Sequence, residues 1–381
     1  MNDSDASNFS DCVTLGLGRR PIEMIHGRFE IAFFRDQPRG KTAMAIFCGD
    51  LATRLPLLTR VHSSCLTSEC LMASDCDCAD QLERSFGMIA EQGRGVVFYL
   101  MQEGRGAGLS AKARDRMMVQ ASGHRLTTFD AYAEMGLPSD LRRYDCVGPM
   151  AQALGILGPL ELLTNNPEKA AGVAASVASH KIEIFRTRKV EGPTSPFNRD
   201  YLQAKRQSGH ALGGGGRLVS AFPPERIEVE GPGWPSVGSH LISTAHYFLP
   251  VELGAARRSD ASVDWFRMRV IHDRRTGRES VLLSLGASRN AAKEMHWGLS
   301  MTLMDRLPCA QARGRAKLRE TLLAIRERGE GRVVIHFEDE NPEAGQALEN
   351  GVDMQPGLTK EILAAVWPTA RAGGEVEDAD G

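Results

Sequence analysis

The stretch Gly95-Val-Val-Phe-Tyr-Leu-Met101 runs directly into Gln102-Glu-Gly-Arg-Gly-Ala-Gly108, and this junction decides the fold class. The first segment is a continuous apolar run, which is typical of a strand buried on both faces of a sheet. The second segment is rich in glycine, and it precedes a segment with Lys112, Arg114 and Arg116 that we expect to be helical. A buried strand, a glycine-rich turn and a helix in this order favour a layered α/β domain.

The segments around this junction continue the alternation of strands and helices. Asp80–Gln92 has apolar residues at helical spacing and stops at Gly93, a typical helix end. We therefore expect a mixed-sheet α/β domain over residues 21–212, with strands at 29–34, 42–48, 95–101, 160–164 and 182–185, and helices at 80–92, 146–157 and after Pro167.

The second half of the chain has a different pattern. Two apolar segments, 265–272 and 279–285, flank Asp273-Arg-Arg-Thr-Gly277 and predict a hairpin. An amphipathic helix over 311–328 and a strand over 332–337 follow, which indicates a smaller α+β domain. The expected organisation is a flexible leader (1–20), the α/β domain (21–212), a glycine linker (213–216), the α+β domain (217–370) and a disordered acidic tail (371–381).

The composition excludes several functional classes. The 381 residues are 42% hydrophobic and 25% charged, and the formal net charge of −2 does not favour nucleic acid as a partner. No apolar run approaches the roughly 18 residues that span a bilayer, and no secretory signal is evident. Since several cysteines cluster together, we expect a metal site in a reducing compartment, the cytoplasm.

Three cysteines, Cys65, Cys76 and Cys78, form the metal candidate. The segment Asp75-Cys-Asp-Cys-Ala-Asp80 is too polar for a core strand. Three thiolate ligands leave one coordination position open, as in catalytic zinc sites. Buried core thiols are the alternative, and a redox pair at Cys76 and Cys78 is weaker because the usual redox motif is C-x-x-C.

Two strand-to-helix turns are candidates for binding an anion. Glycines at 104, 106 and 108 let backbone N–H groups approach a phosphate, and Arg105 adds charge. Thr164-Asn-Asn-Pro-Glu-Lys169 supplies a hydroxyl and a cation at the second turn. Either turn alone is explained by helix capping, but together they indicate a polyanionic ligand.

Five motifs follow one another along the chain: Arg60-Val-His-Ser-Ser-Cys-Leu-Thr67, Cys76-Asp-Cys-Ala-Asp-Gln-Leu82, Gln102-Glu-Gly-Arg-Gly106, Asp140-Leu-Arg142 and Leu162-Leu-Thr-Asn-Asn-Pro-Glu-Lys169. This ordered set resembles GTP cyclohydrolase II, and the resemblance covers roughly residues 25–210. It implies a homodimeric hydrolase that opens the imidazole ring of GTP and releases formate and pyrophosphate. The product is a diaminopyrimidinone ribosylamino phosphate for riboflavin synthesis.

The resemblance also implies roles for individual residues. Cys65, Cys76 and Cys78 would bind one Zn²⁺, and Mg²⁺ would accompany the purine nucleoside triphosphate. Asp140 would be the general base and Arg142 the nucleophile toward the α-phosphorus. The nucleotide would contact Arg60, Val61, His62, Ser63, Ser64, Gln81, Glu103, Gly104, Arg105, Thr128, Thr164 and Lys169.

Three departures from the family pattern keep other functions open. The family usually has Glu at position 64, Glu at 141 and Tyr at 116, whereas this chain has Ser64, Leu141 and Arg116. One alternative is a specialised paralogue of secondary metabolism or pyrimidine catabolism, which acts on another base or stops at the formylated intermediate. Another is a catalytically silent nucleotide-binding regulator that uses residues 217–370 for interactions.

Overall fold

The computed structural model describes residues 12–14, 18–36, 40–213, 218–227, 240–254, 263–286, 296–338 and 355–366. Linker residues 214–216, the tail 371–381 and leader residues 1–11 and 15–17 lie outside the described residues. Within the expected flexible leader, Cys12–Thr14 forms a strand that pairs with Phe34–Asp36. The expectation of a loose leader is therefore wrong for these three residues, because backbone pairing fixes them.

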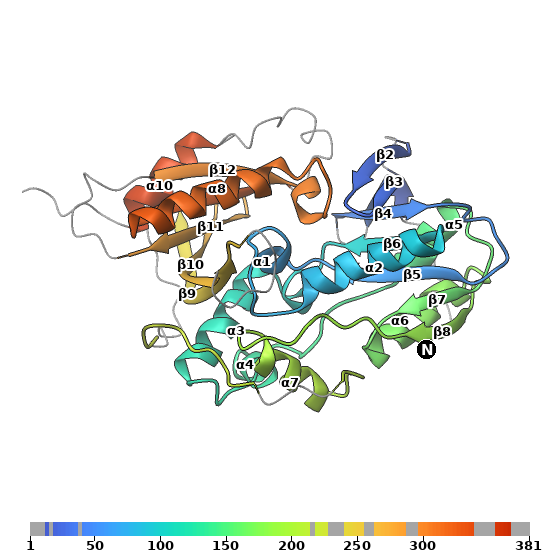
Figure 1. Ribbon diagram of the computed structural model, residues 1–381, viewed down its shortest axis with the longest axis horizontal. Helices are drawn as coiled ribbons and strands as arrows, with labels where there is room; N and C mark the ends of the chain where they lie inside the picture. The colour runs from blue at the N-terminus through green and yellow to red at the C-terminus, as the bar shows by residue number, and fades with distance from the viewer. Residues whose placement is uncertain are drawn as a thin grey trace, which may run out of the picture.

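The first sheet is the mixed sheet that the sequence predicted. Its described strands run in the order β1-β3-β4-β6-β5-β7-β8, with β2 paired to β3. β6, β5, β7 and β8 are parallel, whereas β3 and β4 form an antiparallel hairpin at one side (Figure 1). The bounds are β1 (Cys12–Thr14), β2 (Arg20–Met24), β3 (Gly27–Asp36), β4 (Lys41–Cys48), β5 (Leu57–Ser63), β6 (Gly95–Leu100), β7 (Leu160–Leu163) and β8 (Ile184–Arg188).

Helices follow the parallel strands, as expected for an α/β domain. The predicted helix ending at Gly93 is confirmed, and Gly93 has the left-handed φ of 75° that ends a helix. The helix expected over 146–157 is shorter, because the chain turns at Gly155 with φ 76°. The helices are α1 (Leu66–Glu69), α2 (Cys78–Gln92), α3 (Leu109–Ala121), α4 (Thr128–Glu134), α5 (Val147–Ala153), α6 (Pro167–Ala178) and α7 (Arg199–Gln207), with the 3₁₀ turn η2 (Gly104–Gly106).

The carboxyl ends of three neighbouring strands place the candidate motifs together. Cys65 follows β5, the glycine-rich turn follows β6, and Thr164 follows β7. Because β5 is parallel to both β6 and β7, these ends meet at one edge of the sheet. Ligand sites of open α/β sheets commonly lie at this edge.

A second, five-stranded sheet has the order β12-β13-β11-β10-β9. The predicted hairpin is confirmed: β10 and β11 pair antiparallel, with Asp273 opposite Arg278. α8 and α10 also belong to this part of the molecule (Figure 1). The bounds are β9 (Leu241–Glu252), β10 (Val263–Asp273), β11 (Arg278–Leu285), β12 (His296–Thr302), β13 (Gly331–Glu338), α8 (Arg313–Arg328), α10 (Pro356–Val366) and the 3₁₀ turn η5 (Leu303–Arg306).

The two sheet regions share one hydrophobic core. A single buried cluster contains Leu71 and Met117 from the first region and Leu249 and Phe266 from the second. Burial of this apolar surface stabilises the two parts as one unit. In the described part of the chain, no helix combines the length and apolar character needed to cross a bilayer.

Candidate active site

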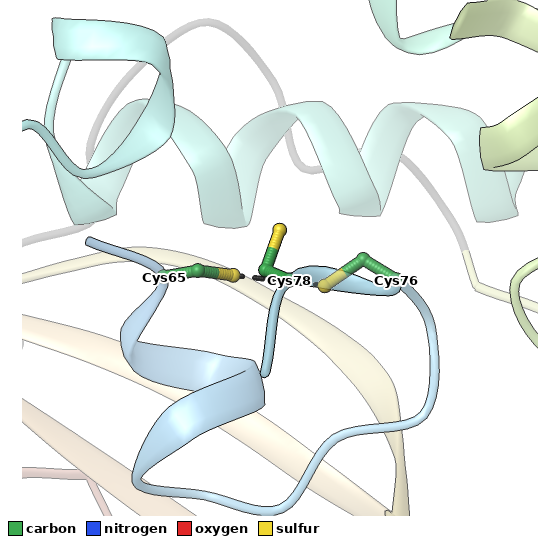
Figure 2. Close-up of side chains that lie close together, drawn as sticks. All are labelled: Cys65, Cys76 and Cys78. Carbon is green, nitrogen blue, oxygen red and sulfur yellow. Dashed lines mark hydrogen bonds between the residues drawn. The ribbon is translucent and has the colours of Figure 1, made fainter. Parts of the chain in front are cut away.

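The three predicted metal ligands come together at the start of α1 and α2. Their sulfur atoms all lie within 4.8 Å of one another, and the Sγ atoms of Cys65 and Cys76 are 3.6 Å apart. Figure 2 shows these two sulfurs turned toward each other, while the Cys78 sulfur points to one side of the line that joins them. Thiolates that bind zinc tetrahedrally at about 2.3 Å lie about 3.8 Å apart, so the cluster fits a metal ion. The separation is far longer than a disulfide bond.

Electrostatics within the cluster favour one thiolate. Hydrogen bonds from Cys76 and Cys78 lower the pKa of Cys65, and the nearby Lys112 ammonium lowers it further. Lys112 Nζ lies 3.1 Å from Cys65 Sγ and 2.9 Å from Glu103 Oε1. The cluster therefore has a buried cation beside its most acidic thiol.

Glu69 fixes the backbone at Cys65 through a hydrogen bond. Its Oε1 accepts hydrogen bonds from the Cys65 N–H at 3.0 Å and from His62 Nε2 at 2.7 Å, while the Tyr99 hydroxyl donates to Oε2. Burial lowers the pKa of His62, although the hydrogen bond to Glu69 opposes this shift. Such supporting contacts fix the ligand geometry of metal sites.

A cavity of about 260 Å³ opens beside Cys78. It contains five cationic side chains, from Arg60, Arg105, Arg142, Lys169 and Lys205, but only two carboxylates, from Asp140 and Glu168. A site with this excess of positive charge suits a polyanion. Ten of the predicted site residues line it: Arg60, His62, Ser63, Cys78, Gln81, Arg105, Asp140, Arg142, Thr164 and Lys169.

The cations are held in place by neutral partners at the strand ends. Arg60 donates to the Leu163 carbonyl at 2.9 Å and to Gln81 Oε1 at 2.7 Å, and within the described part of the chain its Nε has no hydrogen-bond partner. Lys169 donates to the Val61 carbonyl at 2.9 Å. Burial lowers the pKa of Lys169, and the positive charges of Arg60 and Arg142 lower it further. An anion in the cavity would relieve this repulsion.

Asp140 and Arg142 form a close ion pair on the cavity wall. Arg142 Nε donates to Asp140 Oδ1 at 2.9 Å, and Nη2 donates to Oδ2 at 2.5 Å. Burial raises the pKa of Asp140, but the hydrogen bonds and charge of Arg142 outweigh it and lower the pKa overall. The pair is thus ionised and oriented toward the same space as Arg60 and Lys169.

The remaining predicted residues lie around the cavity rather than in its lining. Val61 is on the adjacent strand, and the Gly104 carbonyl accepts a hydrogen bond from Tyr132 at 2.6 Å. Ser64 and Glu103 line a separate cavity of about 410 Å³ between the two sheet regions. Thr128 lines a third cavity of about 270 Å³ and donates to Asp115 at 2.7 Å.

Among the lining residues that were not predicted as site residues are Tyr201, Lys205 and His210. Tyr201 and Lys205 come from α7, and His210 follows that helix. Lys205 Nζ forms an ion pair of 2.8 Å with Asp77, which lies between two of the clustered cysteines. The i,i+4 spacing of Tyr201 and Lys205 places both on one helix face, but nothing in the sequence indicates what that face contacts.

Sequence comparison agrees with this geometry. The family model described as GTP cyclohydrolase II matches residues 17–188. GTP cyclohydrolase-2 of Pseudomonas aeruginosa is 38% identical over 188 residues, which cover 49% of this chain and 88% of the relative. The chain belongs to the GTP cyclohydrolase II family. This is a family of hydrolases, so the chain is identified as an enzyme.

Two further relatives show how far the similarity extends. GTP cyclohydrolase-2 of Saccharophagus degradans is 36% identical over 188 residues, which cover 49% of this chain and 90% of the relative. The riboflavin biosynthesis protein RibBA of Bacillus cytotoxicus is 38% identical over 187 residues, which cover 49% of this chain and 45% of the relative. The match to the family model contains the cysteine cluster and ends at residue 188, before α7 and the second sheet.

Proposed function

We propose that the chain is a zinc-dependent GTP cyclohydrolase II. It would open the imidazole ring of GTP and release formate and pyrophosphate, leaving a diaminopyrimidinone ribosylamino phosphate. The observation that carries this proposal is the cavity that joins Cys78 of the cysteine cluster to five cationic side chains. We call the part of the cavity at Cys78 the cysteine end and the part formed by the five cationic side chains the cation end. A purine ring at the cysteine end and a triphosphate at the cation end would occupy the cavity together.

The cysteine end would hold the metal. Cys65, Cys76 and Cys78 would bind Zn²⁺, which when bound supplies a water molecule that ionises near neutral pH. His62 and Glu69 would fix the orientation of this end through their hydrogen bond. Gln81 accepts a hydrogen bond from Arg60 and donates one to Asp77. It would therefore fix the position of the cation end relative to the cysteine end.

The cation end would bind the triphosphate as its Mg²⁺ complex. Arg60, Arg105 and Lys169 would neutralise phosphate charge, and Thr164 lies at the turn that leads into α6. Ser63 would contribute a hydroxyl from the end of β5. These groups would orient the α-phosphorus toward Arg142.

Asp140 and Arg142 would carry out the release of pyrophosphate. Asp140 would accept a proton from the Arg142 guanidinium as a nitrogen of Arg142 bonds to the α-phosphorus and pyrophosphate leaves. Water would later cleave this phosphorus–nitrogen bond and return the proton to Arg142. The hydrogen bonds of 2.9 and 2.5 Å between Arg142 and Asp140 support this proton transfer.

Incubation with GTP tests the proposal directly. Zinc-loaded protein with GTP and Mg²⁺ should yield formate and pyrophosphate in equal amounts, together with a pyrimidine product of the expected mass. Absence of turnover with GTP, ITP and ATP in zinc-loaded protein would contradict the proposed activity. Nucleotide binding without any bound zinc would favour the regulatory alternative.

Arg116 supports one alternative reaction outcome. Its guanidinium forms an ion pair of 3.1 Å with Asp75, beside the cluster, where the family commonly has a Tyr. Different hydrogen bonding near the base would alter selectivity or arrest the reaction after ring opening. A product that retains the formyl carbon would support this alternative, and its mass distinguishes the two outcomes.

The cellular setting follows from the same proposal. We expect a cytoplasmic enzyme, because the described cysteines Cys48, Cys65, Cys70, Cys76, Cys78, Cys146 and Cys309 are all free thiols. The homodimer implied by the resemblance remains a prediction, which light scattering on the purified protein would test.

A further inference from the structure

The helix α7 completes the active-site cavity from beyond residue 188, where the match to the family model ends. Its residues Tyr201 and Lys205 line the cavity with Cys78 and Arg142, although the family match ends at residue 188. The Lys205–Asp77 ion pair of 2.8 Å anchors the helix at the cysteine cluster. Asp77 is almost fully buried, so this contact fixes α7 more firmly than a surface pair would.

The Tyr201 ring is held between two cations. The Arg116 guanidinium lies 4.6 Å from the ring centroid, and Lys205 Nζ lies 4.5 Å from it. Each cation also forms an ion pair with a carboxylate: Arg116 with Asp75, and Lys205 with Asp77. Cation–π contacts with partly buried rings contribute to a defined ring position. The ring is therefore oriented before any ligand enters.

The hydroxyl of Tyr201 is available to a ligand. Among the described residues, no group forms a hydrogen bond with it. Tyr201 lines both the 260 Å³ cavity and the neighbouring 270 Å³ cavity, so it lies where the two spaces approach each other. An oriented phenol with an unused hydroxyl is a typical specificity group in a small-molecule site.

The charge environment keeps this phenol a hydrogen-bond donor. Burial raises the pKa of Tyr201, the Lys205 ammonium opposes this shift, and the Cys78 thiol adds to it. The hydroxyl is therefore protonated at neutral pH. Tyr201 lines the cavity together with Cys78, and the base of a nucleotide whose phosphates contact Arg142 and Lys169 would lie in this same cavity.

We propose that Tyr201 is a specificity-determining residue whose hydroxyl forms a hydrogen bond with the purine base of the substrate. The proposal rests on the proposed nucleotide function of the same cavity. It assigns to α7 a role in distinguishing bases, whereas Lys205 acts as a positioning residue for the ring.

The variant Tyr201→Phe tests this role, because it removes the hydroxyl and keeps the ring between Arg116 and Lys205. We expect kcat/KM for GTP to fall about tenfold to a hundredfold, since a base group loses its partner. The ratio of kcat/KM for GTP to that for ATP should fall with it, because ATP has an amino group in place of the 6-oxo acceptor, whereas ITP keeps that acceptor and should lose as much as GTP. Zinc content and inhibition by inorganic triphosphate should stay at the wild-type level.

Gln207→Ala is the matched control, because Gln207 is an exposed residue of the same helix. It should keep the wild-type rate and base preference. Unchanged kcat/KM for GTP in Tyr201→Phe would overturn the proposal, since the ring alone would then suffice. An equal loss with GTP, ITP and ATP would also overturn it, because the hydroxyl would not distinguish bases.

Failure of the proposed activity can be separated from failure of this inference. If wild-type protein turns over no purine nucleotide, equilibrium binding of GTP, ITP and ATP to wild type and Tyr201→Phe replaces the kinetic comparison. A base preference that the hydroxyl creates should disappear in the variant. An identical preference in both proteins would overturn the role of Tyr201 whatever the activity.

Discussion

The cysteine end and the cation end of the cavity are built in different ways. The three clustered cysteines come from one short stretch, Cys65 to Cys78, and the buried carboxylate of Glu69 supports the backbone at Cys65. The five cations come from five separate segments between Arg60 and Lys205. A locally built cluster depends on one loop, whereas the cation end depends on the whole α/β domain, including α7.

This difference implies that the two ends are separable by mutation. The metal end should control the chemistry of the base, and the cation end should control affinity for the triphosphate. Substitutions at each end therefore test whether the assignment of chemistry and binding is correct.

The largest effect is expected for Cys76→Ser. Loss of a ligand should remove the metal and lower the rate of ring opening by about a thousandfold or more, because metal activation is worth several kcal/mol. GTP affinity should change little, since the cations remain. Zinc analysis, formate release and GTP binding measure the three quantities. Cys48→Ser, a thiol outside the cluster, should keep both metal and activity. Full activity of Cys76→Ser would show that the cluster has no catalytic role.

Lys169→Ala should weaken GTP binding and leave the metal in place, which is the opposite of the pattern expected for Cys76→Ser. Loss of a buried charge-assisted contact should weaken GTP binding by about 10- to 100-fold while zinc content is unchanged. Calorimetric titration with GTP measures the affinity. The exposed Lys181→Ala should bind GTP like the wild type. Loss of zinc from Lys169→Ala would contradict the separation of the two ends.

Glu69→Gln should weaken the metal end without removing a ligand. Glu69 accepts hydrogen bonds from His62, Tyr99 and the Cys65 N–H, so its neutral analogue should lower zinc affinity by about 10- to 100-fold. Competition with a chromophoric chelator measures this affinity. Glu91→Gln, on an exposed position of α2, provides the control. Unchanged zinc affinity in Glu69→Gln would mean that the cluster does not need this support.

The smallest effect on binding is expected for Thr128→Val. The resemblance implies a nucleotide contact, but the Thr128 hydroxyl donates to Asp115 and lines the neighbouring cavity. We expect a loss of about 1 kcal/mol in the free energy of unfolding, with GTP affinity unchanged. Urea unfolding and GTP titration measure the two values. A tenfold loss of affinity would extend the nucleotide site into the cavity beside Thr128.

The contrast between the two ends also explains what the sequence could predict. The cysteine cluster was foreseeable because its ligands are close in sequence, and β6 because its apolar run is continuous. The place of α7 was not foreseeable, since the Lys205–Asp77 contact joins residues far apart in the chain. The predicted second domain has its own sheet, but its shared core with Leu71 and Met117 could not be predicted. An apolar helix face shows that it is buried but does not identify its partner.

Cobalt substitution tests most directly whether the two ends act on one molecule. In protein loaded with Co²⁺ in place of zinc, addition of GTP should change the visible absorption of the metal, because the base would lie beside the cysteine cluster. The change should saturate at the GTP concentrations that saturate binding, and Lys169→Ala should shift both curves to higher concentration together. GTP binding that leaves the cobalt spectrum unchanged would contradict a single site formed by the two ends.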